Sequence, residues 1–139
     1  MKALMILILI ALMAIPVLAQ YPLVPIDSIQ WAPVGRDSSR YAGDTVITGG
    51  LITAGTGAFY AGAGVTFYME NPAGGDFSGI MAYSSQAQGY PTLYPGDSIL
   101  CTAVVSEYGS NPPPEFVCMT ELLILPSTFQ FRLYGMPEP

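Results

Sequence analysis

The most constraining feature of this sequence is a strand pattern that occurs twice. Residues 43–53 read Gly-Asp-Thr-Val-Ile-Thr-Gly-Gly-Leu-Ile-Thr, and residues 96–106 read Gly-Asp-Ser-Ile-Leu-Cys-Thr-Ala-Val-Val-Ser. Each copy is a Gly-Asp turn followed by β-branched and small residues, which favours a half-buried strand over a helix. Gly49 and Gly50 interrupt the first strand, and paired glycines there indicate a bend at which the strand changes sheets. A bent long strand beside a second long strand predicts a small closed barrel.

Three further strand patterns complete this barrel. Residues 65–70 alternate strictly, and Val65, Phe67 and Met69 are predicted to face the core. Residues 79–84 and 115–125 are also predicted strands, and turn-forming residues separate the segments. The segment 85–95 is too short and too rich in proline for a good helix. The chain is therefore predicted to be all-β, and a five-stranded Greek-key barrel with a bent first strand is the OB-fold pattern.

The segments on either side of the barrel also contain strand signals. Pro22, Pro25 and Pro33 exclude a long helix over residues 21–33, and the alternation over residues 26–31 predicts an extended lead-in strand. Near the end of the chain, Phe129, Phe131 and Leu133 alternate with polar residues and predict an extra C-terminal strand. We therefore expect a lead-in and loop at 20–42, the barrel at 43–125, and a C-terminal strand and tail at 126–139.

Residues 1–19 have the features of a helical secretory signal peptide. Lys2 precedes an apolar run over residues 3–15, Pro16 breaks the helix, and Val17 and Ala19 occupy the positions that a signal peptidase reads. The alternative is a retained membrane anchor, but the run is shorter than the ~20 apolar residues that span a bilayer. We expect secretion to the periplasm or the extracellular space, with no membrane attachment after cleavage.

Charge and composition argue against several classes of function. Loss of Lys2 with the signal changes the net charge from −6 to −7 and leaves Arg36, Arg40 and Arg132 as the only basic side chains. Nucleic-acid binding draws much of its affinity from lysine and arginine, so nucleic acid is a poor partner. The chain has no histidine, which removes Ser-His and Cys-His nucleophiles and histidine-based zinc sites. We expect neither catalysis nor a cofactor.

Short family-like motifs run from Ile26 to Leu125. They are Ile26-x-x-Ile29-Gln30, Asp37-Ser38, Gly43 with 46–48 and 51–54, Phe67-Tyr68-Met69-Glu70-Asn71, Gly79-Ile80-Met81-Ala82-Tyr83, and Gly96-Asp97 through Val105-Ser106-Glu107-Tyr108. In these motifs the chain resembles the OB-fold modules of secreted bacterial proteins, the type appended to extracellular nucleases and surface proteins. The resemblance implies the OB fold. The family's catalytic residues belong to its partner domains, so it implies no catalytic residue here.

The tyrosines are the candidate ligand-binding residues. An OB-fold builds its ligand face from strands two and three and the flanking loops. The alternation places Tyr68 and Tyr83 on that face, and Tyr60, Tyr90 and Tyr94 lie in loops around it. Such rings can stack on sugar rings or on a peptide. The alternative is that they cover the sheet and satisfy their hydroxyl groups locally.

Two groups of acidic residues suggest other chemistry. Glu70, Asn71 and Asp76 flank a Gly-rich turn and offer oxygen ligands for calcium, but their spacing matches no EF-hand loop and a solvated turn is the commoner explanation. Glu107 and Glu115 lie on either side of one hairpin, and glycoside hydrolysis uses two carboxylates. Nothing in the sequence shapes a cleft around them. We expect neither a metal site nor a catalytic pair.

Cys101 and Cys118 are predicted to form a disulfide between the fourth and fifth strands. A turn near residues 111–113 would bring them to nearly opposite positions, and export exposes them to an oxidising compartment. The alternative is that both remain unpaired, because a bulge would turn one sulfur to the opposite face.

These features predict a secreted, non-catalytic OB-fold module that binds a glycan or a protein, or has a structural role, in the cell envelope or outside the cell. The alternative is a nucleic-acid-binding OB domain that works with a separately encoded secreted nuclease. A basic surface would distinguish the two classes, and the scarcity of basic residues favours the first.

The signal peptide leads to a first prediction. Protein recovered from the periplasm or the medium should begin at Gln20, because Ala19 ends the cleavage signal. Intact-mass spectrometry measures this directly. A recovered species that still begins at Met1 would contradict the prediction.

Overall fold

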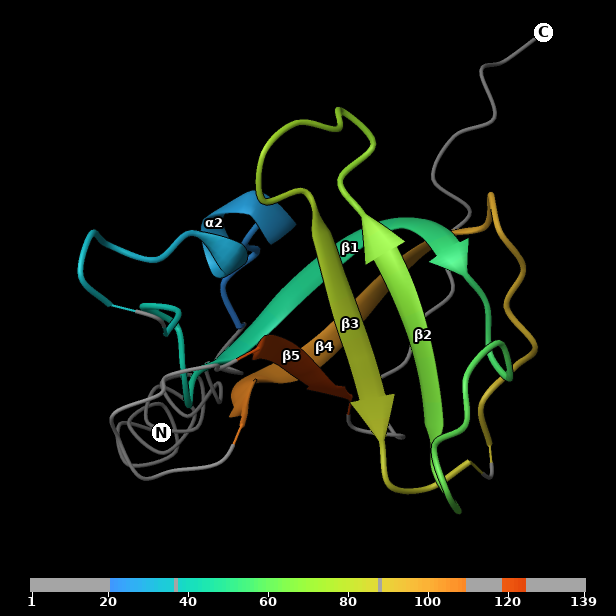
Figure 1. Cartoon of the computed structure of the whole chain (residues 1–139). Helices are drawn as coiled ribbons and strands as arrows, with labels where there is room; N and C mark the ends of the chain where they lie inside the picture. The colour runs from blue at the N-terminus through green and yellow to red at the C-terminus, as the bar shows by residue number, and fades with distance from the viewer. Residues whose placement is uncertain (1–20, 37, 88, 110–118, 125–139) are drawn as a thin grey trace, which may run out of the picture.

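The computed structural model describes residues 21–36, 38–87, 89–109 and 119–124. Its strands are β1 (Thr45–Ala54), β2 (Val65–Glu70), β3 (Gly79–Ser84), β4 (Ser98–Tyr108) and β5 (Met119–Ile124). They close into a barrel in the order β1-β2-β3-β5-β4 (Figure 1), in which β3 and β5 are parallel and the other pairs are antiparallel. This arrangement confirms the predicted all-β, five-stranded OB-like barrel.

β1 closes the barrel because it pairs with two different strands. Its first part, from Thr45 to Leu51, pairs with β4, and its last part pairs with β2. Leu51 belongs to both ladders. Gly49 and Gly50 lie directly before this change of partner, as predicted, but the irregularity in the register of β1 falls later, between Ile52 and Ala54. A methyl group on Gly50 would overlap the carbonyl oxygen of Glu70, so the closure needs glycine at this position.

The sequence repeat corresponds to a local twofold arrangement of β1 and β4. The turn before each strand contains a glycine with positive φ, 91° at Gly43 and 96° at Gly96. Gly43 donates its amide hydrogen to the carbonyl of Val105, and Gly96 donates to that of Ile52, both at 2.8 Å. Val105 and Ile52 hold equivalent positions in the two copies, so each copy starts the ladder in the same way.

The axis of this arrangement lies at the centre of the β1–β4 ladder. Thr48 and Cys101 are equivalent residues of the two copies, and they face each other in the ladder. Both are buried. A twofold rotation about this pair therefore relates the two copies. The sequence repeat corresponds to a structural duplication within the barrel wall.

Alternating residues of the strands fill the barrel. Phe67 is fully buried and Met69 is nearly so, whereas Tyr68 between them is half-buried and faces outward. The core residues contributed by the strands are Val46, Ile52, Phe67, Met69, Ile80, Ala82, Ile99, Cys101, Ala103, Val105, Leu122 and Ile124. The alternation predicted for residues 67–70 is therefore correct, whereas Thr66, predicted on the outward face, is buried.

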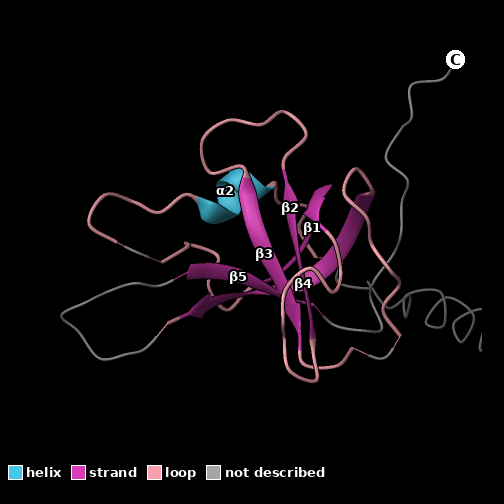
Figure 2. Cartoon of the chain, turned by 45° about the vertical axis from the view of Figure 1, so that its right-hand side comes forward, coloured by secondary structure: helices cyan, strands magenta, loops and turns pink. Residues whose placement is uncertain are grey.

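The predicted lead-in strand is wrong for residues 26–30, which form the short helix α2 (Ile26–Gln30). Ile26 and Ile29 are three positions apart, so one helical turn brings both into the core, where both are fully buried. Only Leu23 makes an isolated parallel bridge, with Ile47. The side-chain amide of Gln30 donates to the carbonyl of Gly79 at 2.5 Å and ties α2 to the start of β3 (Figure 2).

The opposite end of the barrel is covered by the connection between β3 and β4. Leu93 is buried, and its amide donates to Oγ1 of Thr56 at 3.0 Å. Tyr90 packs against the core, and its hydroxyl donates to the carbonyl of Ile124 at 3.2 Å. The described residues of this connection contain no helix, as their prolines predict.

Several predicted features lie outside the described residues. They are the signal peptide at 1–19, the triple-proline turn, Glu115, Cys118 and the C-terminal strand of residues 129–134. Within the described part of the chain, no helix has the length and apolarity required to cross a membrane.

The close approach at Gly50 gives a second prediction. Gly50→Ala should lower the free energy of unfolding by about 3 kcal/mol, the upper part of the usual range for overpacking. The added methyl would meet the backbone of Glu70 and would lie 2.9 Å from Cδ1 of Ile26. Urea unfolding measures the change.

Gly79→Ala is the matched control. A methyl group on Gly79 would have no heavy atom within 4 Å, so its effect should stay within about 0.5 kcal/mol. Equal effects of the two substitutions would contradict the role assigned to Gly50.

Candidate functional site

The outer face of β2 and β3 carries two of the predicted tyrosines. Tyr68 lies opposite Met81 in the ladder, and Tyr83 lies opposite Thr66. Both tyrosines are half-buried. The pair that lies between them in the ladder, Phe67 and Ala82, is fully buried in the core. Strand alternation therefore places these rings on the outside of the barrel, over the ligand face of an OB-fold.

Phe59, in the glycine-rich connection between β1 and β2, extends this aromatic surface. Its ring centroid lies 5.2 Å from that of Tyr68, at an interplanar angle of 65°. This edge-to-face geometry is favourable for aromatic pairs, yet Phe59 remains 55% exposed. Sequence reasoning missed Phe59 because it lies in a loop without periodicity, and only the folded loop brings it to the strand.

A hollow of about 240 Å³ lies on one side of this pair, and we call it the Tyr68 hollow. It is lined by Gln30, Thr53, Tyr68, Met69, Glu70, Gly79, Ile80, Met81, Met119 and Thr120. The hollow combines a ring, flexible methionine side chains, one carboxylate and one amide. Such a mixture can hold an apolar surface while hydrogen bonding to hydroxyl or amide groups.

A second hollow, of about 290 Å³, adjoins Phe59 where β2 begins, and we call it the Tyr90 hollow. Thr66 lines it and is 8% exposed, and its Oγ1 has no hydrogen-bond partner among the described residues. Tyr90 also lines it, with its hydroxyl bonded to Ile124. Burial raises the pKa of the Tyr90 phenol, so this group stays protonated at neutral pH.

The other predicted tyrosines do not join these hollows. Tyr60, Tyr83 and Tyr94 line neither of them. Tyr60 is 96% exposed. The amide of Tyr94 donates to the side chain of Asp97 at 2.8 Å, which places Tyr94 in the turn before β4. The structure thus places Tyr68 and Tyr90 at the hollows on either side of Phe59. The five predicted tyrosines do not form one binding site.

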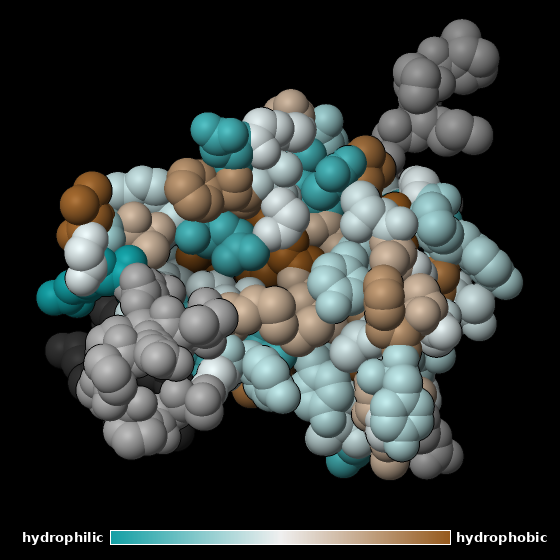
Figure 3. All heavy atoms as spheres, viewed as in Figure 1, coloured by the Kyte–Doolittle hydropathy of each residue, from teal (hydrophilic) through white to brown (hydrophobic). Residues whose placement is uncertain are grey.

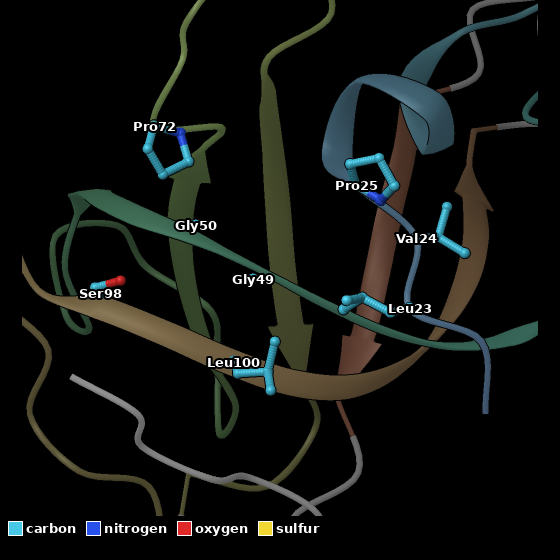
Figure 4. Close-up of a pocket in the computed structure, with 8 residues that line it drawn as sticks. All are labelled: Leu23, Val24, Pro25, Gly49, Gly50, Pro72, Ser98 and Leu100. Carbon is cyan, nitrogen blue, oxygen red and sulfur yellow. The ribbon is translucent and has the colours of Figure 1, made fainter. Parts of the chain in front are cut away.

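A third hollow lies at the bend of β1 and is mainly apolar (Figure 4). It has a volume of about 350 Å³ and is lined by Leu23, Val24, Pro25, Gly49, Gly50, Pro72, Ser98 and Leu100. The absence of side chains at the two glycines leaves room between the N-terminal segment and β4. None of the five predicted tyrosines reaches this hollow.

Among the described residues the acidic candidates lie in separate places, and Glu115, the proposed partner of Glu107, is outside the described residues. Glu70 lines the Tyr68 hollow, whereas Asp76 lines a separate one. Glu107 accepts a hydrogen bond from the amide of Ser39 at 2.7 Å and others from the hydroxyl of Thr120 at 3.1 Å, so it fastens a loop to the barrel. In the described residues, no group of three potential metal ligands is present.

Comparison with known proteins shows a distant likeness to a solved structure. No family model and no curated protein matches the chain. The chain is similar to a solved structure described as an aspartyl-tRNA synthetase from Leishmania major Friedlin, with a TM-score of 0.49 and 10% sequence identity. The match covers 79% of this chain and 21% of that chain. A likeness at this level carries no argument about function.

The register of β4 and β5 differs from the one behind the predicted disulfide. Tyr108 lies opposite Met119, and Ala103 lies opposite Ile124. The described pairs of this ladder run from Ala103 to Tyr108 on β4, so Cys101 has no described partner on β5. Cys118 lies outside the described residues, so the disulfide itself stays a prediction.

Cys101 supplies a third prediction. Its burial raises the pKa of its thiol to about 12, which at pH 8 leaves roughly a thousandfold less thiolate than a free cysteine has. Cys101 should therefore resist iodoacetamide in the folded protein and react after unfolding in the presence of a reductant, as peptide mass spectrometry can show. Labelling of unfolded protein with and without reductant tests the disulfide in the same samples. Rapid native labelling of Cys101 would contradict its burial.

Proposed function

We propose that this protein is a non-catalytic binding module that acts outside the cytoplasm and holds a glycan on the outer face of β2 and β3. The observation that carries the proposal is the pair formed by the exposed Phe59 ring and the half-buried Tyr68 ring between two hollows. An open aromatic surface with a few polar groups beside it suits a ligand that has both apolar faces and hydroxyl groups. The signal peptide predicted from the sequence of residues 1–19 supports the proposed location.

The polar groups of the Tyr68 hollow also suit a glycan. The carboxylate of Glu70 accepts hydrogen bonds, and the amide of Gln30 has a second N–H besides the one that bonds Gly79. Sugar hydroxyl groups can donate to the first and accept from the second. Met81 and Met119 provide apolar contacts that adapt to the shape of the ligand.

The distribution of charge at this face argues against a phosphate backbone as the ligand. In the described part of the chain, the basic side chains are Arg36 and Arg40, and neither lines the Tyr68 or Tyr90 hollow. Strongly hydrophilic residues lie mainly toward α2 and the upper loops, while the front over β2 and β3 is weakly polar or hydrophobic (Figure 3). Nucleic-acid binding relies on basic residues along the backbone.

The fourth prediction tests this proposal. Soluble glucan, xylan, mannan and chito-oligosaccharides are the probes in affinity electrophoresis and calorimetry. Tyr68→Ala should weaken binding to the recognised glycan about tenfold or more, as expected for an aromatic anchor. Tyr68→Phe should retain binding, because the hydroxyl is not part of the ring contact.

Tyr108→Ala is the matched control, since Tyr108 is an exposed tyrosine that lines neither hollow. Thermal unfolding of each variant separates loss of binding from loss of folding. Glycan binding that survives Tyr68→Ala would refute the proposed face. Salt-sensitive binding of labelled oligonucleotides, with no glycan bound, would instead favour a nucleic-acid-binding domain.

A further inference from the structure

A separate hollow lies between α2 with its following loop and the loop that joins β2 to β3. Its volume is about 400 Å³, and we call it the Trp31 hollow. It is lined by Asp27, Ser28, Trp31, Arg40, Asp76 and Phe77. It shares no residue with the hollows beside Phe59, so it is independent of the proposed glycan face.

Two aromatic rings form part of its wall and remain open to solvent. Trp31 is 44% exposed and Phe77 is 55% exposed. Phe77 has a φ of 62°, a left-handed conformation that is unusual for a bulky residue. Its loop is closed by a hydrogen bond of 2.8 Å from the amide of Asn71 to the carbonyl of Ser78. The loop therefore holds the Phe77 ring at the hollow instead of burying it.

The charged groups of the hollow are mainly acidic. Asp27 and Asp76 contribute two carboxylates. Arg40 contributes one guanidinium, which already lies 4.8 Å from the centroid of the Tyr41 ring and donates to the Tyr41 hydroxyl at 2.8 Å. The carboxylates therefore outnumber the single cation, and that cation is stacked on Tyr41.

From these features we propose that the Trp31 hollow binds a small organic ammonium ion. Aromatic faces attract cations, and tryptophan does so most strongly. The two carboxylates add direct attraction, and the negative charge of the chain raises the local concentration of cations. A metal ion would gain little from the rings, because hard cations prefer oxygen ligands. A neutral ligand would leave the carboxylates without a charged partner.

The fifth prediction uses choline as the probe. Trp31 is the only tryptophan of the chain, so its fluorescence reports on this hollow directly. Choline should change the fluorescence in a saturable way that weakens with added salt. Its neutral carbon isostere, 3,3-dimethyl-1-butanol, should bind at least about tenfold more weakly, because it lacks the charge.

Two variants test the residues while the fold is kept. Phe77→Gly should weaken choline binding about fivefold or more, yet it should not lower the melting temperature, because glycine adopts positive φ without strain. Asp76→Asn should also weaken binding. Asp44→Asn removes the same charge from an exposed position that does not line the hollow, and it should have little effect.

Three outcomes would overturn the inference. They are the absence of a saturable signal, equal binding of choline and its neutral isostere, and equal losses from the Asp76 and Asp44 variants. The glycan proposal and the choline proposal can be tested separately. Phe77→Gly should leave the Tyr68-dependent glycan binding intact, and Tyr68→Ala should leave choline binding intact.

Discussion

The barrel depends on how closely β1 approaches β2 at Gly50. Five strands can close only if β1 serves both ladders, and it changes partners at Leu51, directly after this glycine. The same position also faces Ile26 of α2. One missing side chain therefore allows both closure of the wall and docking of the helix that covers the barrel end. Because interiors are close-packed, neither can be adjusted independently of the other.

The twofold repeat shows why only one copy needs the glycine pair. Thr102 and Ala103 of β4 occupy the positions that correspond to Gly49 and Gly50 of β1. Ala103 is fully buried and its methyl group is accommodated within the core. Gly49 and Gly50 instead lie directly against the backbone carbonyls of Ile99 and Glu70, so only this side requires backbone to approach backbone. The duplication fixes the turns and the ladder, and the unequal surroundings determine which residues each copy can accept.

Local patterns in the sequence predicted the wall of the barrel but not its ends. Residues 65–70 and 79–84 form strands with the predicted bounds, because alternation and turns are local signals. The Ile26–Ile29 spacing fits a helical turn as well as the predicted strand. The helix forms because it brings both side chains into contact with the core. Phe59 lies in a loop without a pattern, and its contact with Tyr68 depends on tertiary structure. The register of β5 depends on a long hairpin connection whose length the sequence does not reveal.

The Phe77 loop illustrates where local preference and the observed structure disagree. Phenylalanine favours a strand or the core, yet here it occupies a left-handed position with its ring open to solvent. Glycine would suit this backbone better, and two glycines precede it nearby at positions 74 and 75. A folded chain usually satisfies its local preferences except where another requirement opposes them, and the cation binding proposed for the Trp31 hollow would be such a requirement. The barrel wall thus supplies rigidity, and the residues proposed for recognition come both from its outer face, at Tyr68, and from the connecting loops, at Phe59 and Phe77.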